Sequence, residues 1–549
     1  MSDSGHGVSR RHFFYGALLA GAVPAGGFGS VASLKAAGYK AFNEKLNIAG
    51  IGVGGRGAQD LSGLTSENIV ALCDVDSRQA GPTFKRYDKA TTYSDFRRML
   101  DKEDKNIDAC LVAVADHMHA TVALACMQRG KGVYCEKPLT RTPWEARLLR
   151  DAAAKYNVAT QMGNQGYSHE AHRTACEIVW SGEIGNVTEV HAVTGAPSWP
   201  QGLQEIPPPE PIPAGLEWDL WLGGAAERPY TSGGWDKEHA PTGSSSPGGF
   251  YLPFNWRGFY DFGTGSLGDW GIHTLGPANQ ALQLGMPISI ECIRAEKRSK
   301  FTFPASSVLR YDFPARGDMP PVSIYWYDGV HGDLPYLYRP KGLENENLLP
   351  SPNNLAADKN RPDLGSGGGG GFGGGGGRGQ GAGAGRGQAA AGAPAAAGRA
   401  GAPGAPDAAQ AGRGRGAGGG GRSGATLGVL AGAGSIFVGD KGYMATVQRG
   451  EGVQLLPAAR WADYRLPTPV LTRSPGHYRD WIRACKGGDP ACSNFSIAGP
   501  YAEWVTLGAI AYRYEGKLNY DAKAGRFTNN AEANNFLKPV FRKGWEPKL

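Results

Sequence analysis

The chain has 549 residues, too many for a single compact core, so we expect at least two domains. Its formal net charge is +7, of which residues 1–38 contribute +2 and residues 365–425 contribute +5. The remainder is neutral, which gives no electrostatic support for nucleic-acid binding, so we expect no nucleic-acid partner.

The N-terminus has the pattern of an export signal. Arg10 and Arg11 stand just before a short apolar stretch, residues 13–25, that is rich in Gly and Ala. This stretch is shorter than the ~18 residues that a membrane-spanning helix needs, so it predicts a twin-arginine signal peptide over residues 1–38. We therefore expect the twin-arginine export machinery as a partner, a periplasmic location, and no stable membrane span after cleavage. A disordered basic terminus is the alternative.

Residues 39–163 alternate short apolar runs with helical periodicity. Runs that predict strands lie at 46–51, 69–73, 109–114, 132–135 and 158–162, and helices are expected between them, for example at 121–128 and 143–155. Strands that alternate with helices indicate an α/β domain with a doubly wound parallel sheet, the Rossmann arrangement.

A glycine-rich turn follows the first of these strands. Gly52, Gly54 and Gly57 form a Gly-x-Gly-x-x-Gly pattern, as in turns that hold the pyrophosphate of a dinucleotide. Asp74 ends the next strand, where a carboxylate can accept hydrogen bonds from the ribose hydroxyls and repel a 2′-phosphate. We therefore expect NAD as the cofactor, with NADP as the less favoured choice because Arg78 lies nearby. Glycines that serve packing alone are the alternative.

After residue 163 the chain becomes richer in Gly, Pro and aromatic residues. Strand-like runs lie at 187–193, 308–313, 322–326 and 435–438, and helical patterns at 168–181, 271–284, 478–484 and 502–513. We expect a C-terminal α+β domain over residues 164–364 and 426–530, with a large, mostly antiparallel open sheet and a C-terminal tail over residues 531–549.

Residues 365–425 interrupt this second domain. Of these 61 residues 28 are Gly, and most of the others are Ala, Pro, Arg and Gln. Such a segment buries too little apolar surface to offset its chain entropy, so we predict a disordered insert.

The chain has eight cysteines. Cys73, Cys110 and Cys135 lie in apolar runs and are expected to be inert core thiols. Cys485 and Cys492 are close in sequence, and either a disulfide after export or two unpaired thiols fits them. The Cys and His spacings do not predict a metal site.

Two further motifs carry residues suited to catalysis. Lys137, in Glu136-Lys137-Pro138, ends a predicted strand, where it can hydrogen-bond a substrate hydroxyl and stabilise a developing alkoxide. Asp269 and His273 are four residues apart, so both side chains can lie on one side of a helical turn. An imidazole suits removal of a hydroxyl proton. The alternatives are a surface ion pair for the lysine and a helix cap for the aspartate–histidine pair.

In this order, the glycine turn, Asp74, Glu136-Lys137-Pro138 and Asp269-x-x-x-His273 resemble the Gfo/Idh/MocA family (glucose–fructose oxidoreductase, inositol dehydrogenase, rhizopine catabolism). The resemblance implies an N-terminal Rossmann domain and a C-terminal domain whose open sheet forms an oligomer interface, hence a homo-oligomer. It also implies that the active site consists of Lys137, Asp269 and His273. A cis peptide before Pro138 would fit the family.

Other positions match the family more loosely, and packing roles are the alternative for them. Asp116 and His119 resemble a turn near the nicotinamide, although Ala115 replaces the usual proline. Gln161, Asn164 and Gln165 end the last Rossmann strand, where they can meet the nicotinamide carboxamide or the substrate. The complete cofactor-binding set that we predict is Gly52, Gly54, Gly55, Arg56, Gly57, Asp74, Asp116, His119, Glu136, Lys137 and Gln165. The predicted substrate-binding set is Asn164, Trp256, Arg257, Tyr260 and Trp270.

These features predict an exported NAD-dependent oxidoreductase that acts on a secondary alcohol of a carbohydrate or polyol and keeps its cofactor tightly bound. The alternative within enzymes is a redox-neutral NAD-dependent glycosidase or epimerase that works through a transient keto-sugar. A third possibility is a cofactor-loaded binding or sensory protein without turnover.

Overall fold

The computed structural model describes residues 40, 43–195, 197, 199–232, 249–329, 339–349 and 433–549. The predicted signal peptide over residues 1–38 and the predicted insert over residues 365–425 lie outside the described residues. Among the residues described, no helix has the length and apolar character needed to cross a bilayer.

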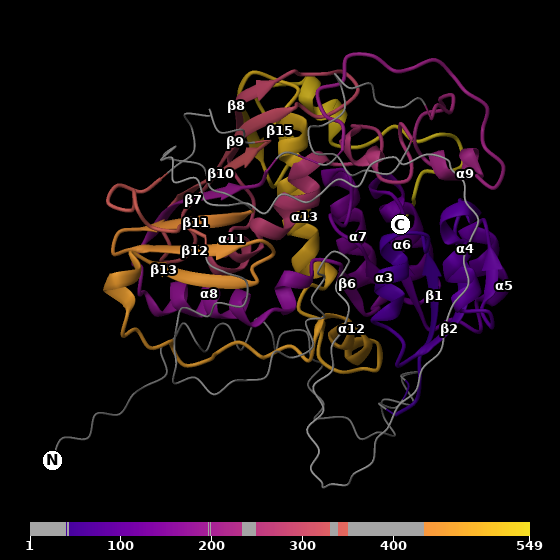
Figure 1. Ribbon diagram of the computed structural model, residues 1–549, viewed down its shortest axis with the longest axis horizontal. Coiled ribbons are helices and arrows are strands. Elements are labelled where there is room, and N and C mark those ends of the chain that lie inside the picture. The colour runs from indigo at the N-terminus through magenta and orange to yellow at the C-terminus, as the bar shows by residue number, and fades with distance from the viewer. Residues whose placement is uncertain are drawn as a thin grey trace, which may run out of the picture. The chain divides into compact units, whose positions relative to one another are not determined.

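The N-terminal domain has a six-stranded sheet in the order β3-β2-β1-β4-β5-β6, and every neighbouring pair is parallel. This confirms the predicted Rossmann arrangement (Figure 1). Its strands are β1 (Asn47–Ile51), β2 (Asn68–Cys73), β3 (Thr91–Tyr93), β4 (Ala109–Val112), β5 (Gly132–Cys135) and β6 (Thr160–Met162). Its helices are α3 (Arg56–Ser62), α4 (Ser77–Arg86), α5 (Phe96–Glu103), α6 (Asp116–Met127) and α7 (Pro143–Tyr156).

Two elements of this domain differ from the prediction. The strand β3 was not expected, because its three residues Thr-Thr-Tyr form a partly exposed edge strand without an apolar run. The helix α6 begins at Asp116 rather than at residue 121. Its first turn, Asp-His-Met-His, has no apolar period, yet tertiary packing buries all four side chains.

The glycine turn is sterically tight at two positions. Gly52 has φ +81°, and a Cβ there would lie 2.6 Å from the carbonyl oxygen of Ala113. A Cβ on Gly57 would lie 2.2 Å from the carbonyl oxygen of Gly52. The chain can therefore pass from β1 into α3 through this turn only with glycine at both positions.

The C-terminal domain has a nine-stranded sheet in the order β13-β12-β11-β7-β10-β9-β8-β14-β15. All neighbouring strands are antiparallel except β7 and β10, which confirms the predicted mostly antiparallel sheet. The strands are β7 (Val187–Val193), β8 (Ser289–Glu296), β9 (Ser306–Phe313), β10 (Val322–Asp328), β11 (Gly434–Gly439), β12 (Tyr443–Val447), β13 (Gly452–Leu456), β14 (Gly516–Asp521) and β15 (Arg526–Phe527).

The helical segments of this part of the chain are mostly short. The α-helices are α8 (Glu170–Ser181), α9 (Trp218–Leu222), α10 (Ile272–Thr274), α11 (Gly276–Ala281), α12 (His477–Cys485) and α13 (Phe495–Ala511). A π-helical turn, η3 (Leu267–Gly271), precedes α10, and 3₁₀ turns are η1 (Gln165–Ser168), η2 (Asn255–Gly258), η4 (Ala458–Trp461) and η5 (Glu532–Phe536). The single helix predicted over 271–284 is therefore broken into several turns.

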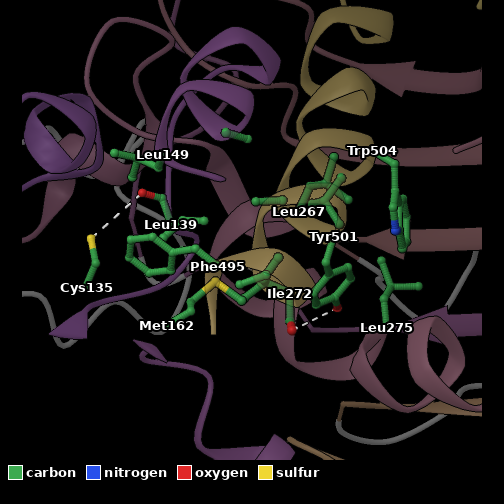
Figure 2. Packing of buried hydrophobic residues seen from close by; sticks show 14 of the residues in the cluster. Cys135, Leu139, Leu149, Met162, Leu267, Ile272, Leu275, Phe495, Tyr501 and Trp504 are labelled. Atoms are coloured by element: carbon green, nitrogen blue, oxygen red, sulfur yellow. Dashed lines mark hydrogen bonds between the residues drawn. The ribbon is translucent and has the colours of Figure 1, made fainter. Parts of the chain in front are cut away.

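The helix α13 joins the two domains. It packs against α7 of the Rossmann domain and against η3 and β8 of the C-terminal domain (Figure 1). Figure 2 shows Phe495 of α13 beside Met162 of β6, and Tyr501 farther along the helix, with its hydroxyl pointing at the backbone of Ile272. The core of the molecule is thus continuous across the two sheets.

Part of the C-terminal chain completes the Rossmann domain. Trp481 and Ile482 of α12 belong to the same buried cluster as Ile48 of β1. Just beyond α12, Lys486 forms a buried ion pair with Glu67 (3.1 Å). A boundary at residue 163 separates the strands of the two sheets. The helix α12, however, which comes late in the chain, packs with the N-terminal domain.

Two other expectations concern cysteines and the peptide before Pro138. Cys73, Cys110 and Cys135 are buried free thiols, as predicted. Cys485 and Cys492 are also free in this structure, which agrees with the unpaired alternative. The peptide between Lys137 and Pro138 is cis, as the family resemblance implied.

We predict that Gly57→Ala destabilises the N-terminal domain, because the added methyl group must displace backbone of the turn. The expected loss of unfolding free energy is about 1–3 kcal/mol, measured by urea denaturation. Gly81→Ala is the matched control, since a Cβ at Gly81 has no heavy atom within 4 Å. Equal stability of the two variants would contradict the tight-turn interpretation.

Candidate active site

A cavity of about 540 Å³ runs along the carboxyl ends of the Rossmann strands and continues into the C-terminal domain. This is the edge at which open α/β sheets bind ligands. Most of the predicted site residues line it, namely Gly52, Gly54, Gly55, Arg56, Asp74, Asp116, His119, Glu136, Lys137, Gln165, Trp256, Arg257, Asp269, Trp270 and His273.

Asp74 lies at one end of the cavity, beside the glycine turn. Its carboxylate accepts hydrogen bonds from the backbone N–H groups of Gly54 (2.8 Å) and Asp76 (2.9 Å). Burial raises the pKa of Asp74 to about 6, although these two hydrogen bonds favour the ionised form. Arg78 instead binds the carboxylate of Asp76 with its Nε (2.8 Å) and Nη2 (2.7 Å). Its guanidinium is therefore already engaged by a carboxylate.

Glu136 organises the middle of the cavity. Its Oε1 accepts hydrogen bonds from Arg56 Nε (3.3 Å), Gln165 Nε2 (3.3 Å) and the hydroxyl of Tyr134 (3.4 Å). Arg56 also forms an ion pair with the buried Asp60 (2.9 Å). The glycine turn, the strand β5 and the turn η1 are thus connected through one carboxylate.

Asp269 joins the two domains at the far end of the cavity. Its Oδ1 is 2.5 Å from Lys137 Nζ and 3.1 Å from Arg257 Nε. Burial alone would raise the pKa of Asp269, but the cations of Lys137 and Arg257 outweigh this effect and hold the pKa below its usual value. The carboxylate of Asp269 is therefore fixed beside the ammonium group of Lys137, as expected for the predicted catalytic set of Lys137, Asp269 and His273.

His273 lies on α10, immediately after the π-helical turn that carries Asp269. Its side chain is buried, and its Nδ1 has no hydrogen-bond partner among the described residues. Burial, reinforced by the positive charges of Lys137 and Arg449, holds the pKa of His273 well below its ordinary value. The imidazole is consequently neutral near pH 7 and able to accept a proton.

The turn that bears His273 is supported from behind by α13. The hydroxyl of Tyr501 donates a hydrogen bond to the carbonyl oxygen of Ile272 (2.9 Å), as Figure 2 shows. Trp504 Nε1 donates to the side chain of Asn279 (Oδ1, 2.9 Å) in α11. The bond from Tyr501 thus anchors the backbone directly before the imidazole, and the bond from Trp504 ties the following helix to α13.

Asp116 and His119 occupy the first turn of α6. Asp116 Oδ2 accepts a hydrogen bond from the hydroxyl of Thr264 (2.8 Å), and burial raises its pKa to about 7. His119 Nε2 is 3.0 Å from the carbonyl oxygen of Val114, and burial lowers its pKa to about 4. Both side chains line the cavity where the Rossmann domain meets the C-terminal domain.

The two tryptophans predicted to contact substrate each carry an arginine over one ring face. Arg257 lies over Trp256 at 4.3 Å, and Arg449 lies over Trp270 at 5.5 Å, measured from Cζ to the ring centroid. Both are cation–π contacts that orient the guanidinium groups. These arginines and tryptophans form the wall of the cavity that the C-terminal domain contributes.

Four residues singled out from the sequence do not line the cavity. Gly57 packs against Gly52 behind the turn. Tyr260 packs against Phe303 in a tilted arrangement (4.3 Å between ring centroids), and Arg513 lies over its ring. It does not line the cavity, so its position does not support the prediction that it contacts substrate.

Gln161 and Asn164, the other two residues that do not line the cavity, are buried at the end of β6. Gln161 donates to the carbonyl oxygen of His477 (2.7 Å). The amide of Asn164 is buried, and no hydrogen-bond partner is present for it among the described residues. Neither side chain lines the cavity, and α12 packs against this strand.

Several lining residues were not predicted, including Gln79, Trp221, Phe254 and Arg449. Phe254 lies two residues before the predicted Trp256, so proximity in sequence could have identified it. Arg449 lies in the turn between β12 and β13, about 180 residues after His273, and carries no local signal.

Residues 46–164 match the family model described as an oxidoreductase family with an NAD-binding Rossmann fold, the Gfo/Idh/MocA oxidoreductases. Inositol 2-dehydrogenase 2 of Saccharopolyspora erythraea is 30% identical over 167 residues, which cover 29% of this chain and 48% of that protein. Inositol 2-dehydrogenase of Salmonella typhimurium is 30% identical over 27% of this chain and 44% of its own length. The chain thus matches about half the length of these curated relatives.

Solved structures give distant likenesses. An inositol dehydrogenase homologue of Azotobacter vinelandii, complexed with NADH and myo-inositol, has a TM-score of 0.45 and 15% identity, covering 87% of this chain and 98% of that one. An aldose–aldose oxidoreductase of Caulobacter crescentus has a TM-score of 0.45 and 12% identity, covering 87% and 100%. The fold assignment therefore rests on strand order and pairing. The N-terminal domain is an NAD-binding Rossmann domain, and it is the part of the chain that matches the Gfo/Idh/MocA family model.

Proposed function

We propose that the protein is an NAD-dependent oxidoreductase that oxidises a secondary alcohol of a carbohydrate or polyol. The observation that carries this proposal is the meeting of Lys137, Asp269 and His273 at the C-terminal end of a cavity that begins at the glycine turn. The names of the inositol dehydrogenase relatives support the same substrate class, although their matches cover only about half of each relative.

The residues at the glycine turn fit a dinucleotide. Asp74 uses its carboxylate for two backbone hydrogen bonds, and a carboxylate has about four acceptor positions, so acceptors remain for ribose hydroxyls. A Cβ at Gly55, which lines the cavity, would have no heavy atom within 4 Å, so this part of the turn borders open space. When bound, NAD⁺ supplies the hydride acceptor for the reaction.

The other end of the cavity fits removal of a hydroxyl proton. His273 is neutral near pH 7 because burial and neighbouring cations lower its pKa, so it can serve as the general base. Lys137, held by Asp269 at 2.5 Å, presents an ammonium group that can donate to the same substrate oxygen. The carboxylate of Asp269 positions the lysine, and Arg257 holds the carboxylate from the other side.

We predict that His273→Ala lowers the kcat/KM for sugar- or polyol-dependent NAD⁺ reduction by about 100- to 10,000-fold, because the general base is lost. The control is His169→Asn, which exchanges one helix-capping side chain for another outside the cavity. Unchanged activity of the His273 variant on every active substrate would contradict the proposal. Glycoside turnover that needs no added NAD⁺ or acceptor would instead favour redox-neutral chemistry.

We propose that Asp74 makes the site selective for NAD over NADP, since its carboxylate, which lines the cavity, repels a 2′-phosphate and Arg78 is engaged by Asp76. Asp74→Asn should shift the NAD-to-NADP ratio of kcat/KM toward NADP by about tenfold, or about 1.4 kcal/mol. Asp95→Asn, at the start of α5 and outside the cavity lining, is the matched control. A ratio that stays constant in the Asp74 variant would refute this role.

We further propose that the chain is exported by the twin-arginine route with its cofactor bound, on the strength of Arg10 and Arg11 before an apolar stretch. Replacement of both arginines by lysine should leave the protein in the cytoplasmic fraction. Replacement of another arginine pair, Arg97 and Arg98 on α5, should not. Immunoblots of cell fractions test the route, and NAD(H) recovered from the periplasmic protein tests tight binding. Periplasmic protein in both variants would disprove the assignment.

A further inference from the structure

The turn that carries Arg449 packs against η1 at the substrate end of the cavity. Arg449 lies between Gln448 (φ +51°) and Gly450 (φ +80°) in this turn, which joins β12 to β13. The N–H of Gly450 donates to the carbonyl oxygen of Val447 (3.0 Å). The carbonyl oxygen of Arg449 itself lies so close to Gly166 that a Cβ there would be 1.7 Å away. The turn is therefore pressed onto η1, and its arginine faces the cavity.

Arg449 is the cavity cation with the weakest internal pairing among the described residues. Arg56, Lys137 and Arg257 each have a carboxylate oxygen within 3.1 Å. The ion pair of Arg449 is with Glu451 at 3.4 Å, and about a quarter of each of these two side chains is exposed. The pair with Glu451 uses Nη1 of Arg449, and a guanidinium carries five N–H donors, so further donors can bind a partner that enters the cavity.

The charges at the substrate end of the cavity are nearly balanced. Lys137, Arg257 and Arg449 lie there with Asp269, which bridges the first two cations. Glu451 pairs with Arg449, and Asp116 is buried with a pKa of about 7. When Asp116 is ionised, three cations are matched by three acids. The long pairing of Arg449, rather than a net charge, therefore makes this guanidinium the group that an anionic ligand can engage.

The position of Arg449 also places such an anion close to the reacting group. Arg449 lies over the ring of Trp270 at 5.5 Å, and the centroid of this ring is 6.1 Å from that of His273. The guanidinium and the imidazole thus both neighbour one indole ring, so one molecule lying against it can present a hydroxyl to His273 and an acidic group to Arg449. A guanidinium pairs best with a planar carboxylate, and one loosely paired arginine matches a single negative charge.

We propose that the substrate is a carboxylate-bearing sugar or polyol, of the uronic or aldonic acid class, whose carboxylate binds Arg449. This inference rests on the proposed oxidation of a secondary alcohol at Lys137 and His273. It adds the chemical class of the substrate and the residue that selects it.

The test compares acids with their neutral parents. For the full chain with NAD⁺, kcat/KM is measured for D-galacturonate against D-galactose, D-glucuronate against D-glucose, and D-gluconate against D-glucitol. We expect at least one acid to exceed its parent by tenfold or more, and its KM to rise with added NaCl while that of the parent does not.

Arg449→Gln should reduce this acid-to-neutral ratio at least tenfold. Arg460→Gln is the matched control, because Arg460 also lies over a tryptophan, Trp461 (4.8 Å), but outside the cavity lining. Equal ratios in the wild type and in the Arg449 variant overturn the proposal, as does a panel in which no acid exceeds its parent. A preference for D-glucose 6-phosphate over every carboxylate also overturns it.

A second readout separates this inference from the proposed oxidation. Tryptophan fluorescence of the NADH-loaded protein is titrated with each acid and each parent sugar. Tighter binding of an acid that is lost in Arg449→Gln supports the carboxylate site even if no substrate is oxidised, in which case the proposed function fails alone. Oxidation of neutral sugars without preferential binding of any acid refutes the carboxylate site alone.

Discussion

The way in which the two domains meet at the substrate end of the cavity depends on the carboxylate of Asp269. A buried charge is stable only when it is paired and hydrogen-bonded, and Asp269 obtains one partner from each side. Lys137 comes from the edge of the Rossmann sheet, and Arg257 comes from the C-terminal domain. A displacement of either domain would leave a buried ion without its partner. The pairing therefore selects the arrangement in which the lysine and His273 face one cavity.

The backbone around Asp269 is organised for the same purpose. A π-helical turn followed at once by a short α-helical turn sets the directions of Asp269 and His273, and such π-turns are frequent at functional sites. Tyr501 anchors this backbone from α13, which also packs on α7 of the Rossmann domain. The helix α13 thus links the Rossmann domain to His273, the proposed general base. Packing of this kind holds a reactive side chain in position before the substrate binds.

Local signals were sufficient to predict the Rossmann domain, because its apolar strands, its glycine turn and Asp74 are all encoded within short stretches of sequence. The same reasoning failed for Tyr260, which is close in sequence to Arg257 but packs against Phe303 in the core. Arg449 could not be predicted at all, since its position depends on the pairing of β12 with β13 and on contact with η1. Such tertiary contacts leave no periodic pattern in the sequence.

Burial is the largest cause of the low pKa of His273, and the positive charges of Lys137 and Arg449 add to it. The low pKa keeps the imidazole neutral but also makes it a weaker base. A substrate carboxylate on Arg449 would offset one of these charges and relieve that part of the shift. Substrate binding and proton removal would then be coupled, in part, through one guanidinium group.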